Sequence, residues 1–173
     1  MEPIGSRSVF EGSVIRLDVE EWPGQPPYEV MHHPGAAAIL PLLPSNELLM
    51  VKQFRPAVRK ILTEIPAGQL DVEGEDALTC ASRELFEETG YRHRAIEFLG
   101  GYYSSPGFTD EYVHLFVAKV HEGAEGGPGE GIELLRTPFH EVVIAARSGR
   151  VRDVKTALAL LLTDAREEVR PVG

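Results

Sequence analysis

Three glutamates stand close together between Arg83 and Gly90, in the segment Arg-Glu-Leu-Phe-Glu-Glu-Thr-Gly. Residues three and four apart lie on the same face of a helix, so Glu84, Glu87 and Glu88 would share one face. Like charges at this spacing destabilise an isolated helix, and the helix dipole disfavours anions near its C-terminus. Bound divalent cations would offset this repulsion, because Mg²⁺ prefers carboxylate and water oxygens.

The segment before the glutamates favours the same chemistry. Residues 65–68 (Ile-Pro-Ala-Gly) end a predicted strand, and Gly68 permits a sharp turn into the loop 69–74. A strand, a glycine loop and an acidic helix together predict a pocket for a hard cation, which one backbone carbonyl could complete. The alternative is a solvated acidic face on which Arg83 pairs with Glu87, four residues away.

The acidic segment belongs to the clearest helix of the chain, residues 76–89, which Gly90 ends. We expect Leu78, Ala81 and Leu85 to point into the core. Hydrophobic patterns predict strands at residues 8–10, 14–19, 28–32, 36–43, 47–54, 61–66, 96–103, 112–120 and 132–136. Two further helices are predicted: one runs from Thr137 as cap and Pro138 as first residue to about 147, and the other covers residues 154–167. Strands interleaved with three helices indicate an α/β class with a mixed sheet.

Composition narrows the class of protein. The chain has 173 residues, 43% of them hydrophobic, which suits one compact domain with a short extra element at one end. Its formal net charge of −10 argues against nucleic acid as a partner. Cys80 is the single cysteine, the N-terminus has no apolar leader, and no apolar run would span a membrane. We therefore expect a soluble, cytoplasmic protein.

The stretch from Gly68 to Tyr91 resembles the Nudix box: Glu75, Arg83-Glu84-Leu85, Glu87-Glu88 and Gly90 all stand at the pattern's spacings. Two positions depart from it. Six residues instead of five separate Gly68 from Glu75, so the loop is one residue longer, and Tyr91 replaces the final aliphatic residue. The resemblance implies the Nudix fold, an α/β/α sandwich around a mixed sheet.

Further segments resemble the ADP-ribose pyrophosphatase subfamily. Residues 103–111 look like that subfamily's loop, in which a proline follows the final glycine of the box by about sixteen residues, and Pro106 stands sixteen after Gly90. Residues 51–56 and 153–156 are similar too; the likeness covers much of residues 28–165 and is weaker before them. It implies hydrolysis of ADP-ribose to AMP and ribose 5-phosphate with Mg²⁺, or Mn²⁺ in its place.

The resemblance also implies how the chain is organised. Residues 1–33 would form an N-terminal β element used for dimerisation and substrate contacts, and residues 34–173 would form the Nudix hydrolase domain. The expected partners are a small nucleotide-sugar substrate and a second copy of the chain in a homodimer, without a membrane.

Roles follow for the residues of the box. Glu84 and Glu88 are the expected main metal ligands and so part of the catalytic set, and the resemblance adds the carbonyl of Ala67. Glu87 is either a ligand, directly or through water, or the ion-pair partner of Arg83. The resemblance assigns the general base to Glu130, in the setting Gly-Glu-Gly-Ile-Glu, with Glu133 as the alternative. In some relatives the base lies in the box helix, and both loop acids could simply be solvated.

Three more residues are expected to bind substrate. Arg55 would grip the diphosphate, because a guanidinium makes paired, charge-assisted bonds to phosphate oxygens. Gly107 would let backbone approach the ligand, and Glu111 would bind substrate or position water. The alternatives are a surface arginine at a strand end and a loop acid paired with a nearby base.

The sequence gives less specific interpretations for Trp22, the histidines and the cysteine. Trp22 could stack on adenine or simply pack. His32 and His33 are read as structural, since no third soft ligand is near them, and Cys80 as inert. The competing functions are a Nudix enzyme for another nucleoside diphosphate sugar or a dinucleotide, a non-catalytic nucleotide-binding Nudix-like domain, and an acidic interaction protein.

Overall fold

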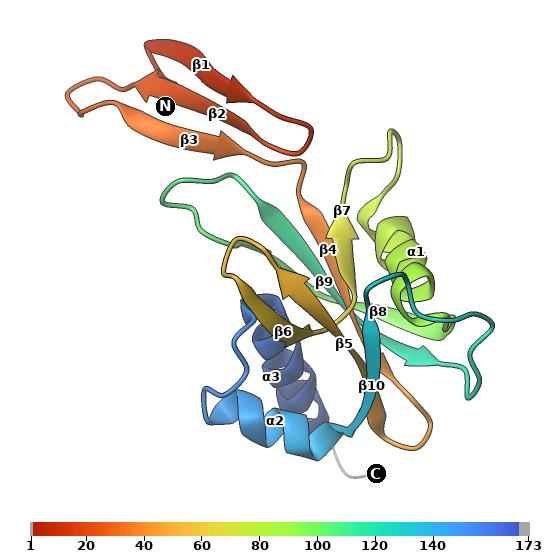
Figure 1. Ribbon diagram of the computed structural model, residues 1–173. Coiled ribbons are helices and arrows are strands. Elements are labelled where there is room, and N and C mark those ends of the chain that lie inside the picture. Colours follow the sequence, from red (N-terminus) through yellow and green to blue (C-terminus); the bar gives the residue numbers. More distant parts are fainter. Residues whose placement is uncertain (1, 170–173) are drawn as a thin grey trace.

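The computed structural model describes residues 2–169, which form two separate sheets and three helices (Figure 1). The strands are β1 (Gly5–Glu11), β2 (Arg16–Glu21), β3 (Tyr28–His32), β4 (Ala36–Leu42), β5 (Glu47–Arg55), β6 (Lys60–Glu64), β7 (Ala67–Gln69), β8 (His93–Tyr103), β9 (Tyr112–Val120) and β10 (Glu133–Pro138). The helices are α1 (Ala77–Thr89), α2 (Phe139–Arg147) and α3 (Val154–Val169). No helix among these residues is long and apolar enough to cross a membrane.

The larger sheet is mixed. Its order is β10-β5-β4-β9-β8, with β6 paired to β5 and β7 paired to β4. β4 and β9 run parallel, whereas the other pairs are antiparallel. Helix α1 covers one face of this sheet, and α2 and α3 cover the other (Figure 1). The predicted α/β/α sandwich around a mixed sheet is therefore confirmed.

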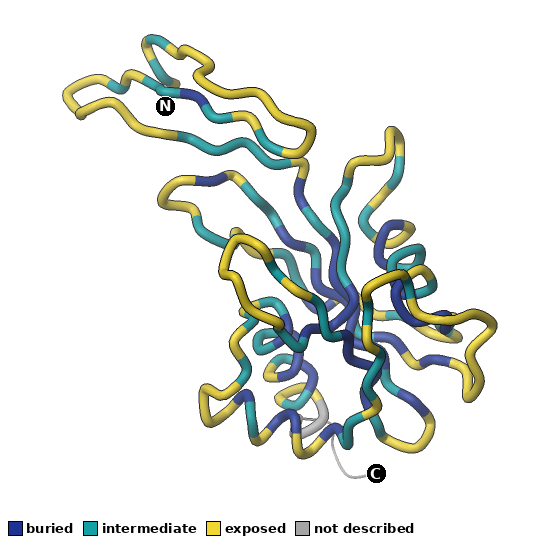
Figure 2. The backbone as a smooth tube through the Cα atoms, in the orientation of Figure 1, coloured by how far each residue is buried: buried dark blue, intermediate teal, exposed yellow. Residues whose placement is uncertain are grey.

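Strand β4 holds the two layers together because its side chains are buried on both faces. Ala37 and Ile39 pack in the cluster that contains α1, while Ala38 and Leu40 pack in the cluster that contains α2 and α3. All four side chains are fully buried, and the tube is darkest along this central strand (Figure 2). Residues alternate between the faces of a strand, so a continuous apolar run is what a strand between two layers requires.

Helix α1 begins and ends where the sequence indicates. The carboxylate of Asp76 caps it by accepting a hydrogen bond from the backbone N–H of Thr79 at 2.7 Å. Gly90 ends it in the left-handed conformation, at φ 74°. Ala81 and Leu85 are buried as predicted, but Leu78 is 44% exposed. That part of the prediction was wrong, because Ala77 instead of Leu78 packs against the core in the first turn.

The start of α2 differs from the prediction. Thr137 and Pro138 belong to the end of β10, where they lie opposite Leu48 and Glu47 of β5. Helix α2 therefore begins at Phe139, and no side chain caps it. Pairing with β5 extends the strand through the proline, which an edge strand tolerates because the missing N–H breaks no interior ladder. The short strand β7 was also missed, because three residues are too few to show a periodic pattern.

The N-terminal strands form their own antiparallel sheet, in the order β1-β2-β3, which projects from the main body (Figure 1). Met31 joins it to the loop after β8, through hydrogen bonds with Phe108 and Asp110. His32 adds a second connection, because its ring lies between Asp18 of β2 and Asp110, 2.6 Å from the latter. Several large apolar side chains of this sheet are exposed: Ile4, Val9, Phe10, Val14 and Tyr28.

Candidate functional site

Gly68 brings strand β7 into close contact with helix α1. A Cβ atom at this position would lie 1.9 Å from Oε1 of Glu84, so only glycine leaves room for that carboxylate. Gly68 lies within β7 and pairs with Ala37 of β4, with no left-handed turn. The sharp turn predicted at Gly68 is therefore wrong: the chain continues through β7, and the glycine instead permits the close approach of Glu84.

Glu88 is the most buried carboxylate of α1, with 8% of the residue exposed. It accepts hydrogen bonds from Nε2 of Gln53 at 2.7 Å and from the backbone N–H of Ala67 at 3.2 Å. Burial disfavours the charged form, and it raises the pKa of Glu88 to about 7 despite these two hydrogen bonds. Burial also raises the pKa of Glu84. Two desolvated carboxylates thus face β7 from one side of α1.

Arg83 provides the positive charge at this cluster. Its guanidinium contacts Glu75 through Nε and Nη2, both at 2.9 Å, Glu84 through Nη1 at 2.5 Å and Glu87 through Nη1 at 3.1 Å. The side chain of Glu87 is 55% exposed, so it points toward solvent beside the ion pair between Arg83 and Glu84. The ion pair between Arg83 and Glu87, one of two alternatives from the sequence, is present.

The donor atoms of this cluster suit a hard divalent cation. Glu84 and Glu88 supply carboxylate oxygens, and Ala67 places backbone beside Glu88. A cation would favour the ionised form of both carboxylates and so reverse the effect that burial has on their pKa values. Within the described residues, no three His, Cys, Asp or Glu side chains are gathered as a metal-binding group. Arg83 holds Glu84 and Glu87 in ion pairs instead.

Arg55 is held by a buried carboxylate that the sequence analysis missed. Its Nε and Nη2 atoms each donate to Glu64 at 2.8 Å, and the Glu64 side chain is only 1% exposed. Lys155 also bonds Glu64, and its Nζ lies 2.8 Å from Asp153. Burial alone would raise the pKa of Glu64, but the two cations outweigh it and lower the pKa. Glu64 therefore fixes the position of Arg55 at the end of β5.

Gly107 and Trp22 line one cavity of about 800 Å³ between the N-terminal sheet and the loop after β8. Aromatic and polar side chains form its wall: Glu20, Tyr28, Tyr103, Phe108, Thr109 and Asp110. No atom would lie within 4 Å of a Cβ at Gly107, so backbone is open there. Glu111 comes directly after Asp110, the last residue that lines this cavity. Its carboxylate accepts a hydrogen bond from the hydroxyl of Ser104, and its Oε1 lies 3.9 Å from Nδ1 of His33.

The acidic loop between β9 and β10 lies against the end of α1. The backbone N–H groups of Glu125 and Gly126 both donate to the carbonyl of Gly90, at 2.8 and 3.2 Å. A Cβ at Gly129 would lie 3.2 Å from the carbonyl oxygen of Glu87. Glu130 is exposed in this loop, whereas Glu133, the alternative base, pairs with Lys52 at 3.0 Å.

Cys80 is fully buried on the side of α1 that packs against the sheet, and burial raises the pKa of its thiol to about 12. A thiol with so high a pKa is a poor nucleophile, in agreement with the prediction that it is inert. His32 pairs with Asp18 and Asp110. Within the described residues, neither His32 nor His33 belongs to a metal-binding group.

The structure brings Ala67, Glu84 and Glu88 together, and Glu87 lies beside them through Arg83. Gln53 and Glu64 were overlooked. One signal was available: Gln53 and Arg55 stand two apart on one strand and so share a face. A second signal was the charged residue Glu64 directly before Ile65, near the end of the strand predicted at residues 61–66.

A mixed sheet between two helical layers, with strand β7 facing two desolvated glutamates of α1, defines an α/β/α protein with a carboxylate site between β7 and α1. Residues 31–158 match the NUDIX domain family. The chain therefore belongs to the Nudix family.

Relatives extend this likeness over nearly the whole chain. A methanol dehydrogenase activator from Bacillus methanolicus is 37% identical over 175 residues, which cover 96% of this chain and 94% of that protein. An ADP-ribose pyrophosphatase from Bacillus subtilis is 36% identical with the same coverage. A GDP-mannose pyrophosphatase from Cronobacter sakazakii is 36% identical over 73% of this chain and 71% of its own length. The crystal structure of an ADP compounds hydrolase shares the fold, with a TM-score of 0.77 at 18% identity and coverage of 96% and 94%.

Proposed function

We propose that this protein hydrolyses the pyrophosphate bond of ADP-ribose and releases AMP and ribose 5-phosphate. The observation that carries the proposal is the pair Glu84 and Glu88, desolvated and aimed at β7 within a Nudix fold. The likeness to the ADP-ribose pyrophosphatase of Bacillus subtilis, which spans both sheets, favours this substrate.

Mg²⁺ is the proposed cofactor, with Mn²⁺ as a substitute. Glu84 and Glu88 would hold it together with the carbonyl of Ala67, and Glu87 would join them directly or through water. When bound, the cation neutralises the diphosphate and lowers the pKa of the attacking water. Arg83 then keeps its two bonds to Glu75 and so stays beside the site.

Arg55 is the proposed ligand of the diphosphate. A guanidinium has five N–H donors, and Glu64 takes two of those on Arg55, which leaves three for phosphate oxygens. The cavity lined by Trp22 and Gly107 would take the adenosine part of the substrate, since its wall is aromatic with a few polar groups. Glu111, held by Ser104, would bind substrate or position water.

A substrate panel tests the proposed reaction. With Mg²⁺ present, ADP-ribose should give AMP and ribose 5-phosphate, and its kcat/KM should exceed that of GDP-mannose. The GDP-mannose pyrophosphatase relative makes that nucleotide sugar the second candidate. Faster turnover of GDP-mannose would move the assignment to that substrate, and turnover of neither would favour a domain that only binds nucleotide.

Glu130 is the proposed general base, because it is exposed in the loop beside α1 and, among the residues that the structure describes, has no ion-pair partner such as the Lys52 that Glu133 has. Glu130→Gln should lower kcat by about 100-fold, the usual contribution of a positioned base. Glu133→Gln is the matched control and should cost much less, because its carboxylate pairs with Lys52. Single-turnover rates over a range of pH will measure both. Equal losses, or a larger loss in Glu133→Gln, would contradict the assignment.

Gly68→Ala should displace the Glu84 carboxylate, because the new Cβ would lie 1.9 Å from Oε1 of Glu84. The side chain of Glu84 can move away from the new methyl group, so we expect the protein to fold. We expect both its affinity for Mg²⁺ and its kcat/KM for ADP-ribose to fall by about tenfold or more. Thermal shift with and without Mg²⁺, together with kcat/KM, will measure this. The control is Gly123→Ala, where no atom lies within 4 Å of the new Cβ. Wild-type rates in Gly68→Ala would contradict the role of Glu84.

We also propose that the protein is a cytoplasmic homodimer. The exposed apolar side chains of β1, β2 and their connections, such as Ile4 and Phe10, would be covered by a second copy. Residues 1–33 would then supply dimer and substrate contacts, and residues 34–173 the Nudix domain. Sedimentation equilibrium of the wild type against Phe10→Ser tests this, with a shift toward monomer as the expected result.

A further inference from the structure

A second cavity lies on the side of the sheet that α2 covers. It measures about 420 Å³, opens to the surface, and is lined by residues of β5, β6, β10, α2 and the loop between α2 and α3. Thr63 lines it, whereas the next residue, Glu64, binds Arg55. Leu62 also lines the cavity, so both faces of β6 contribute to it, but none of the lining residues belongs to the Arg55 cluster or to the carboxylate site at α1.

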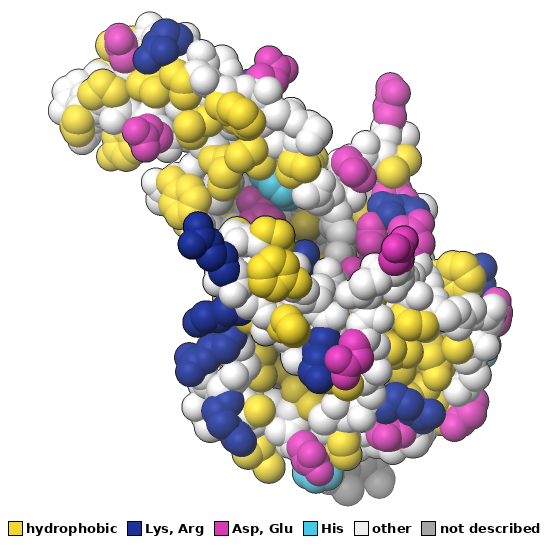
Figure 3. All heavy atoms as spheres, in the orientation of Figure 1, with side chains coloured by type: hydrophobic (Ala, Val, Ile, Leu, Met, Phe, Trp, Pro, Cys, Tyr) yellow, Lys and Arg dark blue, Asp and Glu magenta, His cyan; other side chains and the backbone are white. Residues whose placement is uncertain are grey.

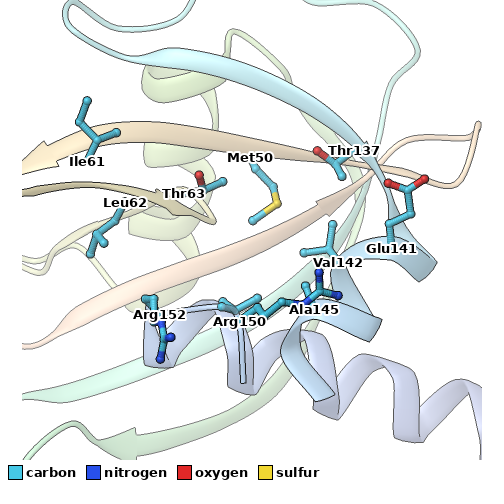
Figure 4. A pocket seen from close by; sticks show the side chains of 11 residues that line it. Met50, Ile61, Leu62, Thr63, Thr137, Glu141, Val142, Ala145, Arg150 and Arg152 are labelled. Carbon is cyan, nitrogen blue, oxygen red and sulfur yellow. The ribbon is translucent and has the colours of Figure 1, made fainter. Parts of the chain in front are cut away.

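The lining combines an apolar body with a cationic rim. Met50 from β5 and Val142 and Ala145 from α2 turn toward the same space (Figure 4). Arg150 extends toward Ala145 from the loop after α2, and Arg152 lies at the rim (Figure 4). A cavity of this volume, with apolar side chains in its body and charged groups at its edge, is in the range of small-molecule sites.

In the part of the chain that the structure describes, the two arginines at the rim have no carboxylate partner. Within the described residues, the guanidinium of Arg150 donates only to Oγ of Ser148, at 2.9 Å, and Arg152 makes no ion pair. Arg59 and Lys60, at the neighbouring β5–β6 turn, are likewise without an ion pair there. Lys and Arg side chains gather along this flank in Figure 3. A chain of net charge −10 has many carboxylates to pair with, so this concentration of unpaired cations is notable.

One carboxylate, that of Glu141, also lines the cavity. It belongs to the first turn of α2, whereas the two arginines follow the end of that helix, although the Arg150 side chain extends back along α2 as far as Ala145 (Figure 4). A ligand's anionic group would therefore be attracted to the arginine end and repelled from the other.

We propose that this cavity binds a small amphipathic anion, with its apolar part against Met50 and Val142 and its carboxylate or phosphate group at Arg150 and Arg152. A guanidinium bonds either group in the same planar manner. The site is separate from the one at α1, so the proposal holds whatever reaction that site performs.

Octanoate is a suitable probe, and octanol is its neutral counterpart. The methyl group of Met50, labelled with carbon-13, reports on the cavity, while Met31 in the N-terminal sheet serves as the reference signal in the same chain. We expect octanoate to shift the Met50 signal in a saturable manner without moving that of Met31. Octanol should bind about tenfold more weakly or worse, because it lacks the charge that the arginines recognise.

Two variants complete the test. Arg150→Gln with Arg152→Gln should weaken octanoate binding by about tenfold or more and leave octanol binding unchanged. Ala145→Phe should fill the cavity and abolish both, with circular dichroism confirming the fold. An unmoved Met50 signal in the wild type would overturn the proposal. So would octanoate binding that survives both variants, and so would equal affinities for octanoate and octanol.

Discussion

Glu88→Gln should lower kcat for ADP-ribose by about 100- to 1,000-fold, the loss that follows removal of one group stabilising transition-state charge. Glutamine keeps the shape of the side chain and an oxygen for Gln53 or the N–H of Ala67, but it carries no charge for the cation. Initial rates at saturating ADP-ribose and Mg²⁺ will measure the change. Glu97→Gln is the control, because that carboxylate is exposed in β8 and pairs with Arg166. A near-normal rate in Glu88→Gln would remove the basis for the proposed metal site.

The same substitution should stabilise the metal-free protein. Folding raises the pKa of Glu88 from its ordinary 4.5 to about 7, so the folded state binds this proton more tightly than the unfolded chain. The stability that Glu88 contributes is therefore complete below pH 4.5 and is lost as the pH rises through 7. Glutamine has no such dependence, so Glu88→Gln should gain up to about 3 kcal/mol over the wild type at pH 8 and much less at pH 5.

Urea denaturation in EDTA at both pH values measures this difference. Saturating Mg²⁺ should raise the free energy of unfolding of the wild type and leave that of the variant nearly unchanged. A variant that is less stable than the wild type at pH 8 would contradict the assignment of Glu88 as a desolvated carboxylate. Activity and stability should thus move in opposite directions at this one residue.

Glu64→Gln should cost about 2–3 kcal/mol of folding stability, below the usual range for a broken buried pair because Arg55 and Lys155 keep some contact with water. The variant leaves two cations without the carboxylate that holds them. Urea denaturation at pH 7 will measure the loss, and KM for ADP-ribose should rise because Arg55 loses its fixed position.

Glu125→Gln is the matched control for Glu64→Gln. It removes an exposed ion pair with Arg92 and should cost no more than about 0.5 kcal/mol. The pH dependence gives a further check. Because its folded-state pKa is lowered, Glu64 contributes stability above pH 4.5 that is lost as the pH falls through that lower pKa. The gap between wild type and Glu64→Gln should therefore narrow in acid, and a constant gap would speak against the ion pairs as its cause.

Much of the fold and part of the site could be predicted from the sequence, because they depend on local signals. The cap at Asp76, the glycine at 90 and the apolar run of β4 each fix an element through its own residues. The spacing of Glu84 and Glu88 likewise places them along one helix. What failed was set by pairing between distant segments: β10 continues through Pro138 because β5 lies beside it.

The same limit explains the residues that were overlooked at the site. Glu64 matters because Arg55 and Lys155 reach it from either side, and Lys155 is 91 residues away in the chain. Gln53 matters because Glu88, 35 residues further on, lies next to it in space. Gly68 was identified, but its purpose depends on the side chain of Glu84 across the gap. Tertiary contacts of this kind leave no periodic trace in the sequence.

The contact between Gly90 and the acidic loop sets the reach of Glu130. The backbone of Gly126 is hydrogen-bonded to Gly90, and the chain enters β10 at Glu133. Glu130 therefore lies in a short loop segment whose two ends are both fixed. Six residues, 127–132, make up the free span. A span of six residues limits how far the carboxylate can move from the end of α1. Inserting a few glycines between Gly126 and Glu133 would lengthen this segment and increase the mobility of the Glu130 carboxylate, without changing helix α1, which carries the other glutamates.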